Sequence, residues 1–255
     1  MSARKVALGL TLLVACTYDA DRLLPPDPGS GAYSPSADAG SKPTVGDPSE
    51  GQTDPATFVQ GRAQGAMSGL GYVSLGVFGK LTSPTCAGMP IASLPPEDPP
   101  VTFDSTCWPS SIKWSSSSAL CVSGTLPAWS ATPSFMEYQT NWGILVGAAT
   151  RDPVRGLGVD YARVALTWTG EEALTRLLAV VHLEGDAANK TYCAPVTSGG
   201  SVRLTSFNTD CSFGSGDLLP AADVRKIDKV GVQIPSRRTA LKLENFCLNK
   251  IVFTK

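Results

Sequence analysis

The feature that most constrains the fold is a series of short segments in which apolar and polar residues alternate, separated by Gly, Pro and Ser. In one segment, Val164, Leu166 and Trp168 alternate with polar or small residues. Similar segments lie at 120–122, 142–146, 177–183, 202–204, 230–234, 241–247 and 250–253. A period of two is typical of half-buried strands, and closely spaced turn signals are typical of sandwiches and barrels. The sequence therefore predicts an all-β domain of the β-sandwich or barrel type.

Composition agrees with this interpretation. Gly (25) and Pro (20) are abundant among 255 residues, and only 17% of the residues are charged, which disfavours a helical bundle or a coiled coil. A short helical turn is expected at 221–226, a hairpin turn at 170–176, and one or two early strands within 67–80. The net charge of −1 provides no field that would attract nucleic acid, so no nucleic-acid partner is expected.

The first residues have the form of a secretory signal. Arg4 and Lys5 precede a run of apolar, Gly and Thr residues at 6–15, which is too short to span a bilayer. The run ends in Leu13-Val14-Ala15-Cys16, which resembles a bacterial lipobox. We expect a signal peptide at 1–15, lipid attachment at Cys16, and an anchored protein at the outer membrane or cell surface. The alternative is an ordinary secretory signal that is cleaved elsewhere.

A proline-rich segment separates this signal from the domain. Seven prolines lie between residues 25 and 57, and residues 17–57 contain seven acidic and two basic side chains. The segment has no periodic apolar pattern, and proline-rich charged chains favour extended conformations. We expect the lipidated cysteine and a disordered linker at 16–57, and a β-domain at 58–255.

Six cysteines remain once Cys16 is set aside, and an exported protein folds in an oxidising compartment. Six cysteines allow 15 pairings. The preferred pairing staples two neighbouring strand-like segments through Cys193–Cys211, joins the first and last strong strands through Cys121–Cys247, and leaves Cys86–Cys107. The domain has no Cys-x-x-Cys motif and the chain has one histidine, so we expect no zinc site.

Several segments resemble the galactose-binding-like jelly-roll domains of the carbohydrate-binding-module type, in particular those of uncharacterised bacterial lipoproteins. They are LCVSG at 120–124, NWGILVG at 141–147, TYCA at 191–194, SFNTDC at 206–211 and VGVQIP at 230–235. The resemblance spans about residues 65–255, implies a jelly-roll β-sandwich, and supports the cysteine pairing above. Many such modules hold a calcium ion near the final strand. Here that segment reads FCLNK at 246–250, and Lys250 disfavours a cation, so no metal is expected.

No motif for catalysis is evident. The chain lacks a nucleophile elbow, a phosphate-binding loop and a His-Glu-x-x-His motif. His182 lies within a strand-like segment, where a lone histidine usually serves packing or faces solvent. We therefore expect no enzyme activity and no cofactor. A glycoside hydrolase, which would need two carboxylates across a cleft, is kept as a less favoured alternative.

Aromatic residues gather at 127–142, a long segment for a sandwich loop. Trp142 belongs to the core by its alternation with Ile144 and Val146. Trp129 and Tyr138 are the candidate ligand-binding residues, because sugar rings pack their C–H faces on aromatic rings. The alternative is that both cover the edge of the sandwich. The expected partner is a polysaccharide or surface glycan; the competing hypothesis is an adhesive or structural surface protein that binds another protein.

Overall fold

A computed structural model shows that the domain is built almost entirely of strands. It describes residues 53–59, 62–67, 69–76, 91–93, 108–132, 140–150, 156–170, 176–187, 190–211 and 216–255. The described strands are β1 (Thr53–Val59), β2 (Arg62–Gly65), β3 (Leu70–Gly76), β4 (Ile91–Ser93), β5 (Lys113–Ser116), β6 (Leu120–Leu126), β7 (Gly143–Ala149), β8 (Arg163–Thr169), β9 (Leu177–Leu183), β10 (Tyr192–Val196), β11 (Ser201–Arg203), β12 (Ile227–Pro235) and β13 (Leu241–Thr254). Two 3₁₀ turns, η3 (Leu204–Ser206) and η4 (Ala221–Lys226), interrupt them.

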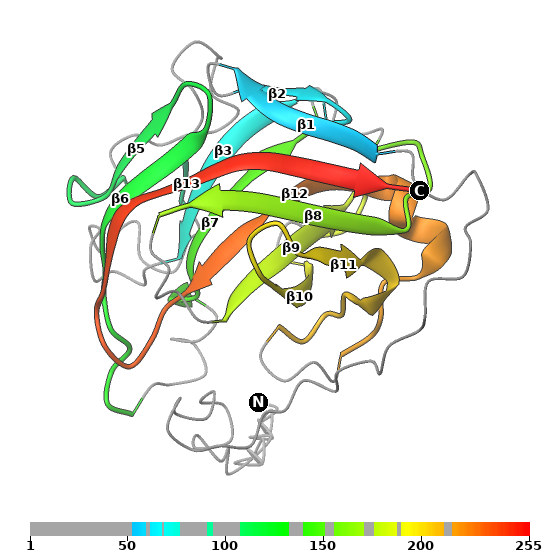
Figure 1. The fold of residues 1–255 in the computed structure, drawn as a ribbon. Coiled ribbons are helices and arrows are strands. Elements are labelled where there is room, and N and C mark those ends of the chain that lie inside the picture. The colour runs from blue at the N-terminus through cyan, green and yellow to red at the C-terminus, as the bar shows by residue number, and fades with distance from the viewer. Residues whose placement is uncertain are drawn as a thin grey trace, which may run out of the picture.

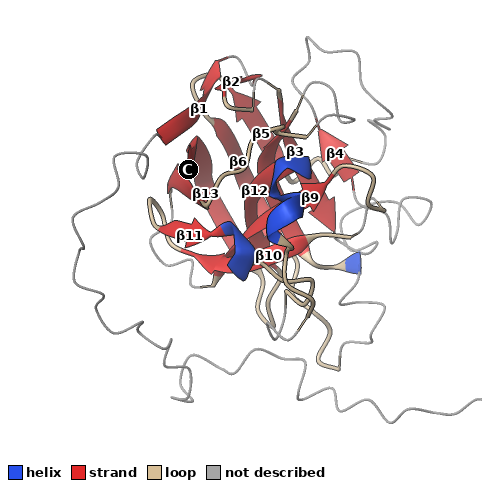
Figure 2. Ribbon diagram, turned by 90° about the vertical axis from the view of Figure 1, so that its right-hand side faces the viewer, coloured by secondary structure: helices blue, strands red, loops and turns tan. Residues whose placement is uncertain are grey.

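The strand order identifies the architecture as a jelly roll. One antiparallel sheet has the order β6–β13–β8–β11, and the other has the order β7–β12–β9–β10. Between β6 and β13 the chain passes repeatedly from one sheet to the other, and eight strands in two such sheets form the double Greek key of a jelly roll. Figure 1 shows β13 and β8 in front of β7, β12 and β9, and Figure 2 shows the same two layers from the side. The predicted fold class is confirmed.

The N-terminal strands extend both sheets. β1 lies beside the second half of β13, and β3 lies beside β7. β2 joins the two sheets through the single pair Arg62↔Leu70. β1 begins at Thr53, so it takes up the last residues of the segment assigned from sequence to the linker. Ala56 and Phe58 explain this extension, because both are buried in the core on the inner side of β1.

The core lies between the sheets and is built by alternation. In the first sheet, Ala56, Ile251 and Leu166 form one inward row across β1, β13 and β8. In the second sheet, an inward row crosses five strands through Val73, Val146, Val232, Ala179 and Ala194. Residues directly opposite each other on antiparallel strands share a face, so the neighbouring rows must point outward.

The two sheets differ on their outer sides. In the second sheet the outward row next to the core row contains Tyr72, Val180 and Cys193, and all three are buried. We call this outer side the covered face. In the first sheet the equivalent row contains Thr57, Lys250 and Thr167, which are exposed or half-buried. We call the outer side of β5, β6, β13, β8 and β11 the open face.

Two of the predicted disulfides are confirmed. Cys121 and Cys247 are directly opposite each other on β6 and β13, with their Cα atoms 4.0 Å apart. Cys193 on β10 is bonded to Cys211, 18 residues further along the chain. The expected Cys86–Cys107 pair and the lipidation site Cys16 lie outside the described residues.

Smaller predictions have mixed outcomes. The turn at Ala221–Lys226 and the early strand Leu70–Gly76 are confirmed. The predicted hairpin at 170–176 is wrong, because β8 pairs with β13 and β11 whereas β9 pairs with β12 and β10. The chain therefore crosses between sheets at this point, as jelly-roll topology requires.

Candidate functional site

Trp129, the described member of the predicted ligand-binding pair, lies just after β6 and is half-buried. Its indole Nε1 donates a hydrogen bond to the carbonyl oxygen of Asn141 at 2.9 Å, and its backbone N–H donates to the carbonyl of Arg237 at 2.8 Å. These bonds fix the ring between the segments that follow β6 and β12. Tyr138 lies outside the described residues.

Asn141 holds these two segments together. Its side chain is 0% exposed, and its Oδ1 accepts a hydrogen bond from the Ser236 hydroxyl at 3.0 Å. Its Nδ2 has no hydrogen-bond partner among the residues that the structure describes. Because the Asn141 carbonyl also receives the Trp129 indole, one buried residue positions the aromatic ring relative to the β12–β13 connection.

Trp142 departs from its predicted core position. Ile144 and Val146 are fully buried, but Trp142 is half-buried and lies before the first residue of β7. Gly143 has a φ of 113°, a left-handed conformation that favours glycine and breaks the pleat ahead of the strand. The Trp142 indole instead packs over Gly76, where a Cβ atom would collide with it.

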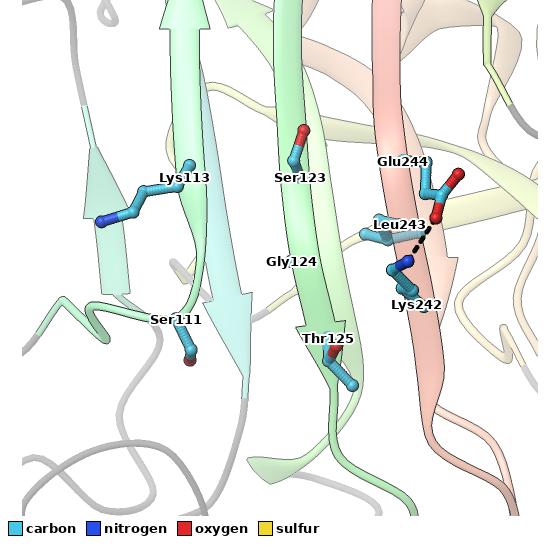
Figure 3. Close-up of a pocket in the computed structure, with 8 residues that line it drawn as sticks. All are labelled: Ser111, Lys113, Ser123, Gly124, Thr125, Lys242, Leu243 and Glu244. Carbon is cyan, nitrogen blue, oxygen red and sulfur yellow. Dashed lines mark ion pairs between the residues drawn. The ribbon is translucent and has the colours of Figure 1, made fainter.

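A shallow groove of about 360 Å³ lies on the open face, where β5, β6 and β13 are neighbours. Trp129 follows β6 in the sequence. Figure 3 shows its lining side chains on three neighbouring segments, β5 with the residues before it, β6 and β13. The lining residues are Ser111, Lys113, Ser123, Gly124, Thr125, Lys242, Leu243 and Glu244. None of them is aromatic, so the groove offers hydroxyl and charged groups, and Trp129 follows β6, one of its three strands, by three residues.

Backbone irregularities shape this groove. Glu244 and Asn245 together oppose Ser123, because the register between β13 and β6 shifts between Leu243 and Phe246. Asn245 adopts a φ of 60°, and its backbone N–H donates to the Ser123 hydroxyl at 3.1 Å. Such a bulge increases the local twist of a strand. Gly124 lies at the same level, where any Cβ would collide with the Ser111 carbonyl oxygen.

The groove carries both signs of charge. Lys242 forms an ion pair with Glu244, drawn in Figure 3. The hydrogen bond from Lys242, and then its positive charge, lower the pKa of the Glu244 carboxyl below its ordinary value. Lys113, on β5, forms no ion pair with any described residue. Hydroxyls, an ammonium group and an ion pair together suit a ligand that is rich in hydroxyl groups.

A second polar cluster lies on the covered face. His182 is 7% exposed and Asp228 is 4% exposed, and His182 Nδ1 lies 2.7 Å from Asp228 Oδ1. His182 Nε2 lies 3.2 Å from the carbonyl oxygen of Ala187. Both ring nitrogens therefore face oxygen acceptors, and the ring links the end of β9 to the start of β12. The interpretation of His182 as a packing residue agrees with this geometry.

Sequence reasoning named Trp129 but missed the groove and the His182–Asp228 pair. The alternation of β5, β6 and β13 places Lys113, Ser123, Thr125 and Lys242 on one face, and that signal was present in the sequence. That β5, β6 and β13 are neighbours in one sheet is known only from the fold. His182 and Asp228 are 46 residues apart, so no local pattern joins them.

No cluster of three His, Cys, Asp or Glu side chains suited to a metal ion occurs among the residues that the structure describes. Within the same residues, no helix is both long enough and apolar enough to cross a bilayer. No protein-family model matches the chain, and a search of curated proteins gives no match.

Proposed function

We propose that the chain is a lipid-anchored extracytoplasmic protein whose jelly-roll domain binds a polysaccharide or surface glycan without catalysis. The observation that carries this proposal is the shallow groove on the open face, whose lining combines hydroxyl and charged side chains with apolar surface, together with Trp129 three residues beyond the end of β6. Sugar hydroxyls are recognised by convergent polar groups, and sugar C–H faces pack on aromatic rings. The resemblance to carbohydrate-binding modules supports the proposal as an analogy at the level of fold.

Rigid positioning of Trp129 supports this role. Two hydrogen bonds hold the residue, and the one to Asn141 comes from the indole itself. A ring that is already fixed loses little conformational freedom when a ligand packs on it, so more of the contact energy remains available for binding. The hydroxyls of Ser123 and Thr125 on β6 would then orient the ligand along the groove.

Affinity electrophoresis of the full chain in gels that contain single polysaccharides tests glycan binding. Trp129→Ala should weaken binding by about tenfold or more, as expected for a tryptophan at the centre of a binding site. Trp168→Ala is the matched control, because Trp168 is also half-buried and packs against Phe246 with ring centroids 6.1 Å apart. Retention by no polysaccharide would overturn the proposal, as would equal binding by both variants. Co-purification of one protein partner without any retention would favour the adhesive alternative.

Anchoring is tested separately at Cys16. In the full chain expressed in a lipoprotein-processing bacterium, Cys16→Ser should abolish incorporation of labelled fatty acid and move the protein from the membrane fraction to the soluble fraction. Mass spectrometry should find a mature N-terminus at acylated Cys16 in the unsubstituted protein. A mature protein that begins elsewhere, or that carries no acyl chain, would overturn this part of the proposal.

A further inference from the structure

The open face is strongly basic, although the whole chain has a net charge of −1. Its five strands place one acidic side chain, Glu244, at an outward position. The same positions hold five basic side chains: Lys113 on β5, Lys242 and Lys250 on β13, Arg163 on β8 and Arg203 on β11. Positive charge is therefore concentrated on this one surface.

Strand register places these cations on the same side of the sheet. Lys242 is directly opposite Thr125, and Lys250 is directly opposite Thr167. Arg163 is directly opposite Arg203, so two guanidinium-bearing residues are adjacent at the far edge. Lys113 is level with the Glu244–Asn245 bulge of β13, Lys250 lies further along that strand, and Arg163 is directly opposite Thr254. The cations therefore follow a diagonal that combines roughly 19 Å across the four strand steps with roughly 30 Å along β13. An extended ligand that follows this diagonal would meet a cation near each end and in the middle.

Most of this charge has no partner of opposite sign. Lys242 is paired with Glu244, whereas Lys113, Lys250, Arg163 and Arg203 form no ion pair with a described residue. Arg163 donates hydrogen bonds to the side chain and the carbonyl of Ser201, which hold its guanidinium in place. Like charges on one exposed surface repel each other, and an anionic ligand removes that repulsion.

The remaining outward side chains indicate which polyanion fits. They include the hydroxyl residues Ser123, Thr125, Thr167, Ser201 and Thr254, and no outward position of these five strands is aromatic. Single-stranded nucleic acids bind by stacking their bases on aromatic side chains, so this face lacks the groups that they require. Hydroxyls both donate and accept hydrogen bonds, which matches the hydroxyl groups of a sugar.

We infer that the open face selects an acidic polysaccharide, whose carboxylate or sulfate groups meet Lys113, Lys250 and Arg203 while its hydroxyls meet the Ser and Thr side chains. This inference rests on the proposed glycan-binding function and names the chemical class of its ligand.

The test compares two polymers with the same sugar backbone, one with free carboxylates and one with neutral methyl esters. The full chain, in detergent, is titrated with polygalacturonate and with fully methyl-esterified polygalacturonate. Polygalacturonate should bind more tightly, and its binding should weaken as salt is raised. Replacing Lys113, Lys250 or Arg203 singly by Gln should weaken polygalacturonate binding about two- to fivefold, and the triple variant should weaken it at least about tenfold. Lys250→Gln and Arg203→Gln, which lie outside the groove lining, should leave binding of the esterified polymer unchanged.

A matched triple variant removes the same charge elsewhere. Lys190→Gln, Arg225→Gln and Lys229→Gln lie before β10, in η4 and on β12, all away from the open face, and should leave polygalacturonate binding within about twofold of the unsubstituted chain. Equal binding of the charged and esterified polymers would overturn the inference and leave the proposed function intact. Binding of no polysaccharide, charged or neutral, would overturn both. Equally tight binding of single-stranded DNA or phosphatidylglycerol vesicles would show a general polyanion surface and overturn the assignment to polysaccharide.

Discussion

The two sheets of the sandwich bury similar apolar residues on their inner sides, but their outer faces carry very different residues. On the covered face, Tyr72, Val180 and His182 point away from the inter-sheet core and are nevertheless buried. On the open face, Lys250 and Thr167 occupy the equivalent outward row and remain half-buried. Alternation places one side of every strand in the core. The side chains on the opposite, outward side determine whether that face of the sandwich contributes to stability or to recognition.

This difference predicts where substitutions act. A polar group on the covered face is desolvated, so its partner is needed for stability. A charged group on the open face is solvated, and surface ion pairs contribute little to stability. Substitutions of buried polar residues on the covered face should therefore change the free energy of unfolding, whereas substitutions of charged residues on the open face should change ligand binding.

The largest expected effect separates the two disulfides. In the chain-entropy model, losing Cys121–Cys247, which spans 126 residues, costs about 5 kcal/mol, and losing Cys193–Cys211, which spans 18, costs about 3 kcal/mol. Urea unfolding of the two Cys→Ser double variants measures both free energies. An equal or smaller loss for the 126-residue pair would show that the strand pairing of β6 with β13, and not the crosslink, holds the open face together.

The next largest effect belongs to the covered face. Asp228→Ala leaves the buried His182 ring without its hydrogen-bond partner at 2.7 Å, and leaving a buried polar group unsatisfied costs about 1–3 kcal/mol. Asp228→Asn retains an acceptor of the same size and should cost less. Urea unfolding gives both values. If Asp228→Ala were neutral, the His182–Asp228 pair would not stabilise the covered face, and the contrast between the faces would fail.

Alkaline pH tests the burial of the covered face, with a smaller expected change in the free energy of unfolding. Burial, and then the nearby Asp228 charge, raise the pKa of Tyr72 on the covered face above its ordinary value. Burial, and then the hydrogen bond to Asp54, raise the pKa of Tyr161 from 10.0 to about 12. In each case the folded protein binds the phenolic proton more tightly than the unfolded chain does. The stabilisation is complete below pH 10 and is lost as the pH rises toward 12.

Urea unfolding at several pH values between 9 and 12 measures this loss. Tyr72→Phe and Tyr161→Phe should each reduce the slope of the unfolding free energy against pH, because each removes one titrating group. An unchanged slope in Tyr72→Phe would show that its hydroxyl is solvated, contrary to the burial of the covered face.

Much of the fold follows from local patterns. Alternation in β8 is strong because Val164 and Leu166 are buried between half-buried neighbours, and Cys121 lies in a strand with the same signal. The start of β1 was missed because Pro55 and its polar neighbours hide two inward residues. The hairpin at 170–176 was wrong because sequence proximity favours pairing of successive strands, whereas jelly-roll connections cross between sheets.

The candidate site was less accessible to prediction. The residue type of Trp129 marks it as a candidate, but its hydrogen bond to Asn141 depends on how two connections meet. The groove depends on β5, β6 and β13 being neighbours, and strand order requires long-range pairing that a local pattern does not contain. The basic character of the open face depends on register as well, because Arg163 and Arg203 are 40 residues apart in the sequence.

The smallest expected effect is a change in ligand binding that concerns one residue of the open face, Glu244. Glu244→Gln removes the single acidic side chain among the outward positions of its five strands and frees Lys242 from its ion pair. Because both side chains are largely exposed, the free energy of unfolding should not change measurably. Polygalacturonate binding should instead tighten about twofold, since one negative charge is removed from the surface that meets the ligand. Asp223→Gln, which breaks the exposed Lys226–Asp223 pair in η4, is the matched control and should alter neither quantity. Tighter binding in Glu244→Gln alone places the recognition of acidic groups on the open face, whereas equal tightening in both variants would trace it to net charge and not to this surface.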